Sequence, residues 1–347
     1  MSTRDSQGRG GCVDARRTGE ARVGAGVRRG LAITDLVVLL ALIALAAAVL
    51  VPLSGAGRRM AQDESELEKL AWFVQVQGWY AADNQDKFAT FSWKAGQCPS
   101  QFPDLQFAAT DLEAAANQAV DIIRRRSVMT NFARVSGWLP HVLTSHVVFA
   151  DYLDRPIPDK RFISELDALQ IKWAKDPANW QQNNAPSARA SFWSSYETGP
   201  AFYSSPDRGS DAMNQNTSHN LYLVPANCKF GGNQLSAVAH PSRKALRWDR
   251  YERHAAGPQP YFGYTQGKIA VLTADGSVLR RDMTTSDPGW NPNSPDSPLG
   301  MQYGYQPAYY EPPTLSGQSS DRIYGRLRWT RNALLGWDFP GNSVRGR

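Results

Sequence analysis

The sequence predicts an α+β protein in which one long N-terminal helix packs on an antiparallel sheet that carries a helical insertion. Three observations predict this class. An apolar run over Leu31–Leu53 continues into apolar residues at helical spacing as far as about residue 82. Helix signals fill residues 109–175. Two apolar runs flank Asp275-Gly276, a favoured two-residue turn for a β-hairpin.

The first half of the helix, residues 31–53, is expected to cross a membrane. At about 1.5 Å per residue its 23 residues make a helix of roughly 34 Å, which exceeds a hydrocarbon core of about 30 Å. Residues 1–30 hold seven arginines and three acidic residues, and this excess favours a cytoplasmic N-terminus. Arg58 and Arg59 weaken that signal without reversing it. The rest of the chain is therefore expected outside the cytoplasm.

Other kinds of N-terminal segment fit less well. A cleaved secretory peptide rarely has a basic region of 30 residues, and no clear A-x-A site ends the apolar run. A twin-arginine signal matches Arg28-Arg29 loosely, but Asp35 lies inside the apolar run. A plain signal anchor that carries an unrelated domain remains an alternative.

The second half of the helix, residues 54–84, reads as amphipathic. Charged side chains (Asp63, Glu64, Glu66, Glu68 and Lys69) are expected on the side away from the apolar stripe. The stripe consists of Met60, Leu67, Leu70, Ala71, Val74, Gly78 and Ala81. A bend is expected near Pro52 and Gly55/Gly57, because proline removes a helix hydrogen bond.

The register of the apolar run resembles the N-terminus of type IV pilins and type II secretion pseudopilins. If cleavage follows Gly30, Leu31 becomes position +1, Asp35 position +5 and Pro52 position +22. In that family a dedicated peptidase cuts after a glycine and methylates the new N-terminal residue. The family normally has Glu at +5 and often Pro at +22. Here +1 is Leu rather than Phe or Met, and +5 is Asp.

The resemblance implies a structural function and a location. The chain would be a pseudopilin-like subunit of a type II secretion or type IV pilus-like filament, with a single pass through the inner membrane. Its partners would be the membrane, the prepilin peptidase and other pilin-like subunits. Leu31 would be the methylated residue, and Asp35 would offset the amine of a neighbouring subunit. Ala44 and Ala46–Ala48 suit close packing between helices.

Three further segments resemble a bacterial group of pseudopilin-like proteins. The group has a Q-x-x-x-x-Y-A-x-D-N-x-x-x-F stretch after the first helix, an A-D-G hairpin and a closing T-R-x-x-L-x-G-x-D-F run. The His that often precedes the hairpin Asp by ten residues is Thr265 here. The matching residues are Gln75, Tyr80, Ala81, Asp83, Asn84 and Phe88, then Asp275-Gly276, then Thr330, Arg331, Leu334, Gly336, Asp338 and Phe339.

The globular head is expected over residues 85–347. A helical insertion occupies 105–176, and Thr110-x-x-Glu113 fits a capping box at its first helix. Leu139–Leu153 and the stripe from Phe162 to Trp173 predict two more helices. Residues 190–285 are read as β-rich, with a strand over Asn220–Val224. Residues 286–347, rich in Pro and Tyr, fit a long ordered loop or a disordered tail.

Composition limits the partners. The net charge is +6, of which +4 lies in residues 1–30. The nearly neutral remainder argues against nucleic acid as the main partner. Cys98 and Cys228 are candidates for one disulfide if the head is exported, or for two separate, partly buried thiols.

No catalytic constellation is evident, so we expect no enzyme, no cofactor and no metal. G-x-S-x-G is absent, and the five histidines share no motif. The acidic pairs Asp282/Asp287 and Asp207/Asp211 lack calcium-loop spacing. An alternative function is a signal-anchored binding protein that holds polysaccharide or protein on an aromatic-rich face. That face would include Trp248, Tyr251, Tyr261, Tyr264, Trp290, Tyr303 and Tyr305.

Overall fold

The computed structural model describes residues 33–135, 142–204, 213–220, 222–225, 228–255 and 257–341. Within its first helix the side chains of residues 34, 35, 46–56, 58 and 59 are not described. The chain divides into two compact units, residues 1–55 and 56–347.

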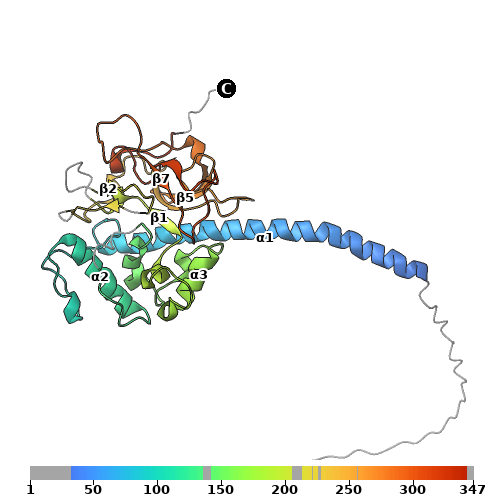
Figure 1. The fold of residues 1–347 in the computed structure, drawn as a ribbon, viewed down its shortest axis with the longest axis horizontal. Coiled ribbons are helices and arrows are strands. Elements are labelled where there is room, and N and C mark those ends of the chain that lie inside the picture. The colour runs from blue at the N-terminus through green and yellow to red at the C-terminus, as the bar shows by residue number, and fades with distance from the viewer. Residues whose placement is uncertain are drawn as a thin grey trace, which may run out of the picture. The chain divides into compact units, whose positions relative to one another are not determined.

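Helix α1 extends over Ile33–Asp83, 51 residues (Figure 1). A membrane span needs about 20 consecutive apolar residues. In the part of the chain that is described, no helix offers a stretch long and apolar enough to cross a membrane. The prediction that residues 31–53 cross a membrane is therefore wrong. The fold class is corrected to a mixture of helices and antiparallel sheets in which no described helix spans a membrane. The predicted single-pass location in the inner membrane is wrong for the same reason.

The amphipathic part of α1 buries a face that overlaps the predicted one only in part. Leu70 and Ala81 of the predicted stripe are buried, but Met60 and Val74 are exposed, and Phe73 and Tyr80 from outside the stripe are buried. Glu66, expected in solvent, is 1% exposed, and one of its carboxylate oxygens accepts a hydrogen bond from the Tyr196 hydroxyl at 3.1 Å. Aromatic partners from distant segments thus decide which face of the helix is covered.

The end of α1 follows the prediction from Asp83-Asn84. The Asn84 N–H donates to the Tyr80 carbonyl at 3.0 Å. The next two residues, Gln85 and Asp86, have φ of 58° and 64°, which stops the helix. The Gln77 side chain then fixes the returning chain, because it donates to the Lys87 carbonyl and accepts from the Ala89 N–H, each at 3.1 Å.

Helix α2, Asp111–Arg126, begins with the predicted capping box. The Thr110 hydroxyl accepts from the Glu113 N–H at 3.2 Å, and the Glu113 carboxylate accepts from the Ala109 N–H at 2.9 Å. Its buried apolar residues are four alanines with Val120, Ile122 and Ile123, and the small alanine side chains let it pack closely on the core.

The two other predicted helices are shorter than expected. The described part of 139–153 forms a 3₁₀ helix, Ser145–Tyr152. The stripe from Phe162 to Trp173 divides into a 3₁₀ turn, Lys160–Phe162, and helix α3, Ala168–Lys175. Asp159 and Asp167 each accept a backbone N–H at an N-cap, so they start two separate elements. The remaining 3₁₀ turns are Pro103–Leu105, Pro177–Asn179, Ala188–Phe192, Pro200–Phe202, Leu235–Ala237, Met283–Thr285 and Ala333–Leu335.

Four antiparallel strands form the main sheet in the order β1-β4-β5-β6. They are Tyr196–Thr198, Ala245–Asp249, Lys268–Thr273 and Val278–Asp282. The predicted hairpin joins β5 to β6, but its turn is longer than two residues. The Gly276 N–H donates to the Thr273 carbonyl at 2.9 Å, and Gly276 itself has φ of 88°. Glycine is the residue that adopts this conformation without a steric cost.

Two small sheets complete the head. Strands β2, Asn214–Gln215, and β3, Tyr222–Leu223, pair antiparallel, so the predicted strand over 220–224 is shorter than expected. Strands β7, Gln302–Tyr305, and β8, Asp321–Tyr324, form a second antiparallel pair. The described part of the Pro- and Tyr-rich region is therefore an ordered loop with its own strands.

The core lies on both sides of the main sheet. Phe73 of α1 contacts Phe149 of the insertion and Tyr196 of β1, with ring centroids 6.4 and 5.6 Å apart. The C-terminal part of α1 thus lies between the insertion and the sheet (Figure 1). A second cluster on the sheet is largely aromatic and contains Trp248 and Tyr261.

Candidate functional site

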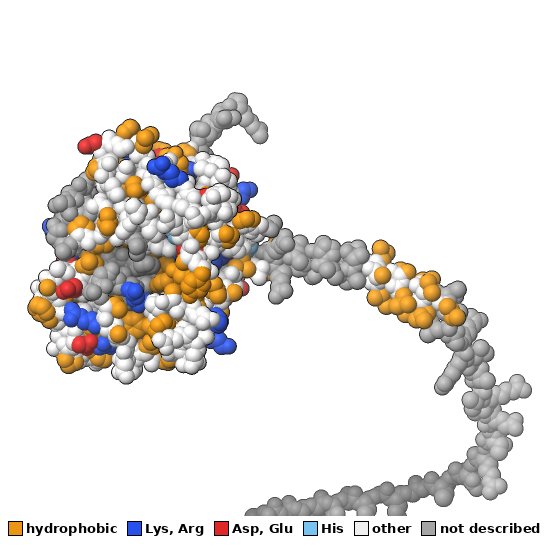
Figure 2. Space-filling view, in the orientation of Figure 1, with side chains coloured by type: hydrophobic (Ala, Val, Ile, Leu, Met, Phe, Trp, Pro, Cys, Tyr) orange, Lys and Arg blue, Asp and Glu red, His pale blue; other side chains and the backbone are white. Residues whose placement is uncertain are grey.

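The N-terminal part of α1 carries a dense set of exposed apolar side chains. Nine of them are between 49% and 82% exposed, and Figure 2 shows them as an apolar stretch of the helix. Because these positions are nearly consecutive, they cover every side of the helix. They are Ile33, Leu36, Val37, Val38, Leu39, Leu40, Leu42, Ile43 and Leu45.

The structure describes only some of the residues that are predicted to take part in processing and assembly. Gly30 and Leu31, the predicted cleavage and methylation positions, lie outside the described residues. Asp35 and Pro52 lie within α1, but their side chains are not described. Of these four positions, the structure therefore describes only the helical backbone at Asp35 and Pro52.

Cys98 and Cys228 are both buried thiols. Cys98 packs in a small cluster with Ala108 and Ala114, whereas Cys228 belongs to the main core. Burial raises the pKa of the Cys98 thiol. Of the two alternatives for this pair, the structure contains the separate thiols.

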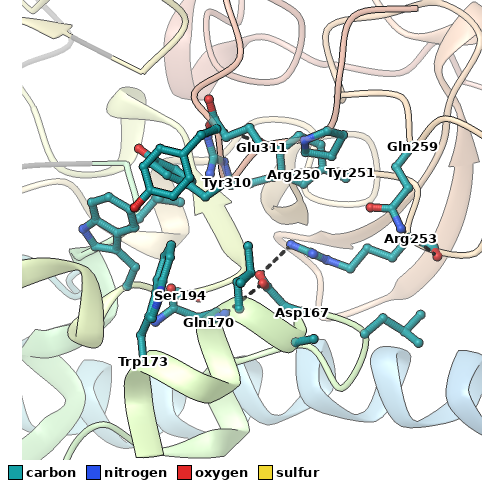
Figure 3. Close-up of a pocket in the computed structure, with 17 residues that line it drawn as sticks. Asp167, Gln170, Trp173, Ser194, Arg250, Tyr251, Arg253, Gln259, Tyr310 and Glu311 are labelled. Carbon is teal, nitrogen blue, oxygen red and sulfur yellow. Dashed lines mark hydrogen bonds and ion pairs between the residues drawn. The ribbon is translucent and has the colours of Figure 1, made fainter. Parts of the chain in front are cut away.

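A pocket of about 350 Å³ opens in the head beside α3. Its lining combines several aromatic rings with two arginines and two carboxylates (Figure 3). Asp167, Gln170 and Trp173 lie on one side, and Arg250, Tyr251, Tyr310 and Glu311 lie on the other.

The apolar wall of the pocket is built by Trp173, Trp193 and Tyr310. The Trp173 and Tyr310 centroids are 5.5 Å apart and nearly perpendicular, and Trp193 lies 5.8 Å from Tyr310. Trp173 is 3% exposed, and within the described chain its indole N–H has no hydrogen-bond acceptor. An oxygen atom of a ligand bound in the pocket is one acceptor to which such a buried N–H can donate.

The charged residues of the pocket neutralise one another. Arg253 reaches across the pocket to Asp167, with a nitrogen–oxygen distance of 3.0 Å (Figure 3). Arg250 pairs with Glu311, also at 3.0 Å. Because each cation has its anion, the pocket offers no uncompensated charge to a ligand.

Glu311 is the most heavily bonded of these groups. Its carboxylate accepts from the His219 ring at 3.0 Å, the Tyr251 hydroxyl at 3.1 Å and the Ala308 N–H at 2.9 Å, in addition to Arg250. Burial by itself would raise the pKa of Glu311. The hydrogen bond from His219 and the charge of Arg250 outweigh burial and hold that pKa well below its usual range.

His219 is a neutral donor in this network. Burial lowers its pKa below the ordinary value of 6.5. The hydrogen bonds assign the tautomer, because Nδ1 accepts from the Gln306 N–H at 3.4 Å and Nε2 is left to donate to Glu311. A neutral imidazole held on both sides serves to orient the carboxylate.

The aromatic face expected from residues 248–310 is not a surface. Trp248, Tyr261 and Tyr305 are 0% exposed, and Tyr251, Tyr264 and Tyr303 are also buried. They form the second core cluster, and Trp290 is half-buried. This expectation is corrected, because packing inside the head accounts for these rings.

The pocket residues were missed because they come from five separate segments of the chain. Trp173 counted only as part of a helical stripe, and Tyr310 only as part of a Tyr-rich run. Two local signals point to them: Asp167-x-x-Gln170 is a helix-start pattern, and Glu311 is the single acidic residue between Asp296 and Asp321. Over the described ranges, no three His, Cys, Asp or Glu side chains are grouped as metal ligands.

Comparison of the chain with protein-family models, with curated proteins and with solved structures gives no match. Function is therefore inferred from the residues and geometry of this chain.

Proposed function

We propose that this chain is a structural subunit of a pseudopilin-like filament of a type II secretion or type IV pilus-like system. The observation that carries this proposal is the set of nine exposed apolar side chains over Ile33–Leu45 on a 51-residue helix. Each copy would bury this part of α1 against the same part of neighbouring copies.

Burial of these side chains supplies the driving force for assembly. Full burial of Val, Leu or Ile is worth about 1.5–3 kcal/mol, so a half-exposed side chain gains about 1 kcal/mol. Summed over the set, this gain is comparable with the free energy of a stable complex. The small side chains Ala44 and Ala46–Ala48 would let neighbouring helices approach closely.

Processing is part of the same proposal. A prepilin peptidase would cut after Gly30 and methylate Leu31. Asp35 would then offset the new amine of a neighbouring subunit. The register of Gly30, Asp35 and Pro52 along the sequence supports this step. The role is structural, so the other partners are pilin-like subunits.

N-terminal sequencing of the mature protein tests the processing, and a start at Leu31 is expected. Assembly is tested by chemical cross-linking and electron microscopy of wild type, Leu40→Arg and Leu299→Arg. Leu40 is 57% exposed in the proposed contact and Leu299 is 73% exposed on the head. A buried arginine is costly, so Leu40→Arg should abolish the multimers and Leu299→Arg should leave them unchanged.

A different mature N-terminus refutes the proposed processing. Equal multimers in both variants, or none in wild type, refute assembly through α1. Asp35→Ala and Asp35→Glu test the contribution of the carboxylate charge separately from that of the apolar helix contact. Only Asp35→Ala, which removes the charge, should lose filaments.

A second function, binding of a neutral saccharide in the head, is favoured by the pocket beside α3. Trp173, Trp193 and Tyr310 supply apolar ring surface, and Gln170 and Ser194 supply polar groups next to it. The paired charges favour a neutral ligand over an acidic one. Calorimetric titration with neutral and acidic hexasaccharides tests this idea, with Tyr310→Ala as the variant. Equal binding by wild type and Tyr310→Ala contradicts it.

A further inference from the structure

A buried lysine, threonine and aspartate meet where the C-terminal segment returns to the main sheet. Lys244 directly precedes strand β4, and Thr330 and Asp338 lie in the closing run of the chain. Lys244 is 0% exposed, Asp338 2% and Thr330 4%. The Arg243 carbonyl accepts from the Asp338 N–H at 3.0 Å, which fixes the two segments side by side.

The hydrogen bonds within this cluster have a defined direction. The Lys244 ammonium group donates to the Thr330 hydroxyl oxygen and to Asp338 Oδ2, the latter at 3.3 Å. The Thr330 hydroxyl in turn donates to Asp338 Oδ1 at 2.5 Å. The Ala245 N–H donates to Oδ2 at 2.8 Å. The two carboxylate oxygens of Asp338 therefore have different hydrogen-bond donors: Thr330 at Oδ1, and Lys244 and the Ala245 N–H at Oδ2.

The surroundings disfavour the ionised pair. The Lys244 side chain has no exposed surface, and the Asp338 side chain is only 2% exposed, so water solvates neither charge well. Burial lowers the pKa of Lys244 and raises the pKa of Asp338. Both directions favour the neutral amine and the neutral carboxylic acid, which are the forms that react with each other.

We propose that Lys244 and Asp338 condense into an intramolecular isopeptide bond. The lone pair of Lys244 Nζ attacks Asp338 Cγ, a C–N bond forms, and the C–Oδ1 bond breaks. One proton passes from the ammonium group to the carboxylate before the attack. A second leaves the nitrogen during the attack, so that Oδ1 departs as water. No oxidant, cofactor or other reactant is required.

Two groups next to Lys244 and Asp338 would transfer the proton and stabilise the developing charge in this reaction. Thr330 lies between the amine and Oδ1, so its hydroxyl can accept a proton from nitrogen while it passes its own to the leaving oxygen. The Ala245 N–H faces Oδ2, where negative charge develops as the tetrahedral intermediate forms. Oδ2 therefore remains as the amide carbonyl oxygen. The bond would close a loop between positions 94 apart in the sequence, whether or not filaments form.

Mass spectrometry of the intact wild-type protein tests the proposal directly. The mature chain should weigh less than its sequence requires by the mass of one water molecule. After trypsin, the peptide Lys244–Arg247 should appear joined to Asn332–Arg345 as one branched species. A folded wild-type protein at full mass, without this branched peptide, overturns the proposal.

Three controls separate condensation from simple proximity. Lys94 and Asp111 are equally close, at 3.2 Å, but their side chains are 40% and 24% exposed, so this pair should give no branched peptide. Lys244→Arg keeps the charge and cannot condense, so it should restore the full mass. Asp338→Asn should lose ammonia in place of water. A water deficit that persists in Lys244→Arg assigns the loss to other residues and refutes the proposal.

Discussion

Replacement of Glu311 by glutamine should destabilise the head strongly. The side chain is 1% exposed, and its two oxygens accept from His219, Tyr251, the Ala308 N–H and Arg250. Glutamine keeps the size but replaces one acceptor with an NH₂ group that faces donors. It also leaves Arg250 without its closest anion.

The magnitude follows from the buried pair. Removal of one partner of a buried ion pair costs about 3–5 kcal/mol, because the remaining charge is left uncompensated. Domains are stable by about 5–15 kcal/mol, so this single change removes a large share of the total. Arg250 also lies 3.6 Å from Glu197, which keeps the loss toward the lower end of that range.

Equilibrium unfolding in urea measures the effect. Glu165→Gln is the matched control, because Glu165 is 55% exposed and lies 3.6 Å from Lys69. Exposed pairs of this kind contribute about 0–1 kcal/mol. The midpoint should therefore fall clearly for Glu311→Gln and hardly at all for Glu165→Gln, with similar slopes.

The pH dependence gives a second readout. The pKa of Glu311 is lowered in the folded protein, so its stabilising contribution is full above the ordinary carboxyl pKa and is lost as the pH falls. The difference between wild type and Glu311→Gln should be largest near neutrality and shrink below the ordinary value of 4.5. A difference under about 1 kcal/mol at neutral pH, or one that stays constant into acid, would refute the network as a source of stability.

Three further predictions concern single positions in the head. Gly276→Ala should lower the stability by about 1 kcal/mol in thermal melts, since φ is 88° at this position. Gly257→Ala is the control, because a Cβ at Gly257 meets open space and its φ is not positive. This control should melt like the wild type. Thr110→Ala should cost about 1 kcal/mol through loss of the α2 cap, and Thr110→Ser should restore most of it; equal melting of both variants would argue against the cap. Burial raises the pKa of Asp249 to about 8, so the folded protein keeps a proton that the unfolded chain releases, and wild-type stability should fall as the pH rises toward 8. Asp249→Asn should lack this fall in urea unfolding at several pH values, and parallel profiles would contradict the assignment.

Local patterns were read correctly where the deciding contacts are close in sequence. The capping box at Thr110 joins residues three apart, and the end of α1 at Asp83 is fixed by bonds within one turn. The hairpin at Gly276 was found from its turn residues, although its turn is longer than predicted. Such interactions depend on backbone propensity, which the sequence shows directly.

The buried face of α1 could not be read in this way. Its pattern contains apolar residues on more than one side, so periodicity alone did not decide between Val74 and Phe73. Contacts with Phe149 and Tyr196, far away in the chain, select Phe73. The same contacts bury Glu66, because Tyr196 provides its hydrogen bond.

The sequence by itself determined the helix that ends at Asp83, the cap at Thr110 and the hairpin at Gly276. Only the tertiary structure decided that the aromatic residues around Tyr261 form a core, that Glu311 meets Arg250, and that Lys244 meets Asp338. The physical reason is the range of the interactions. Propensity and periodicity act over a few neighbouring residues, whereas buried charges and pockets are assembled from segments that become neighbours only when the chain has folded.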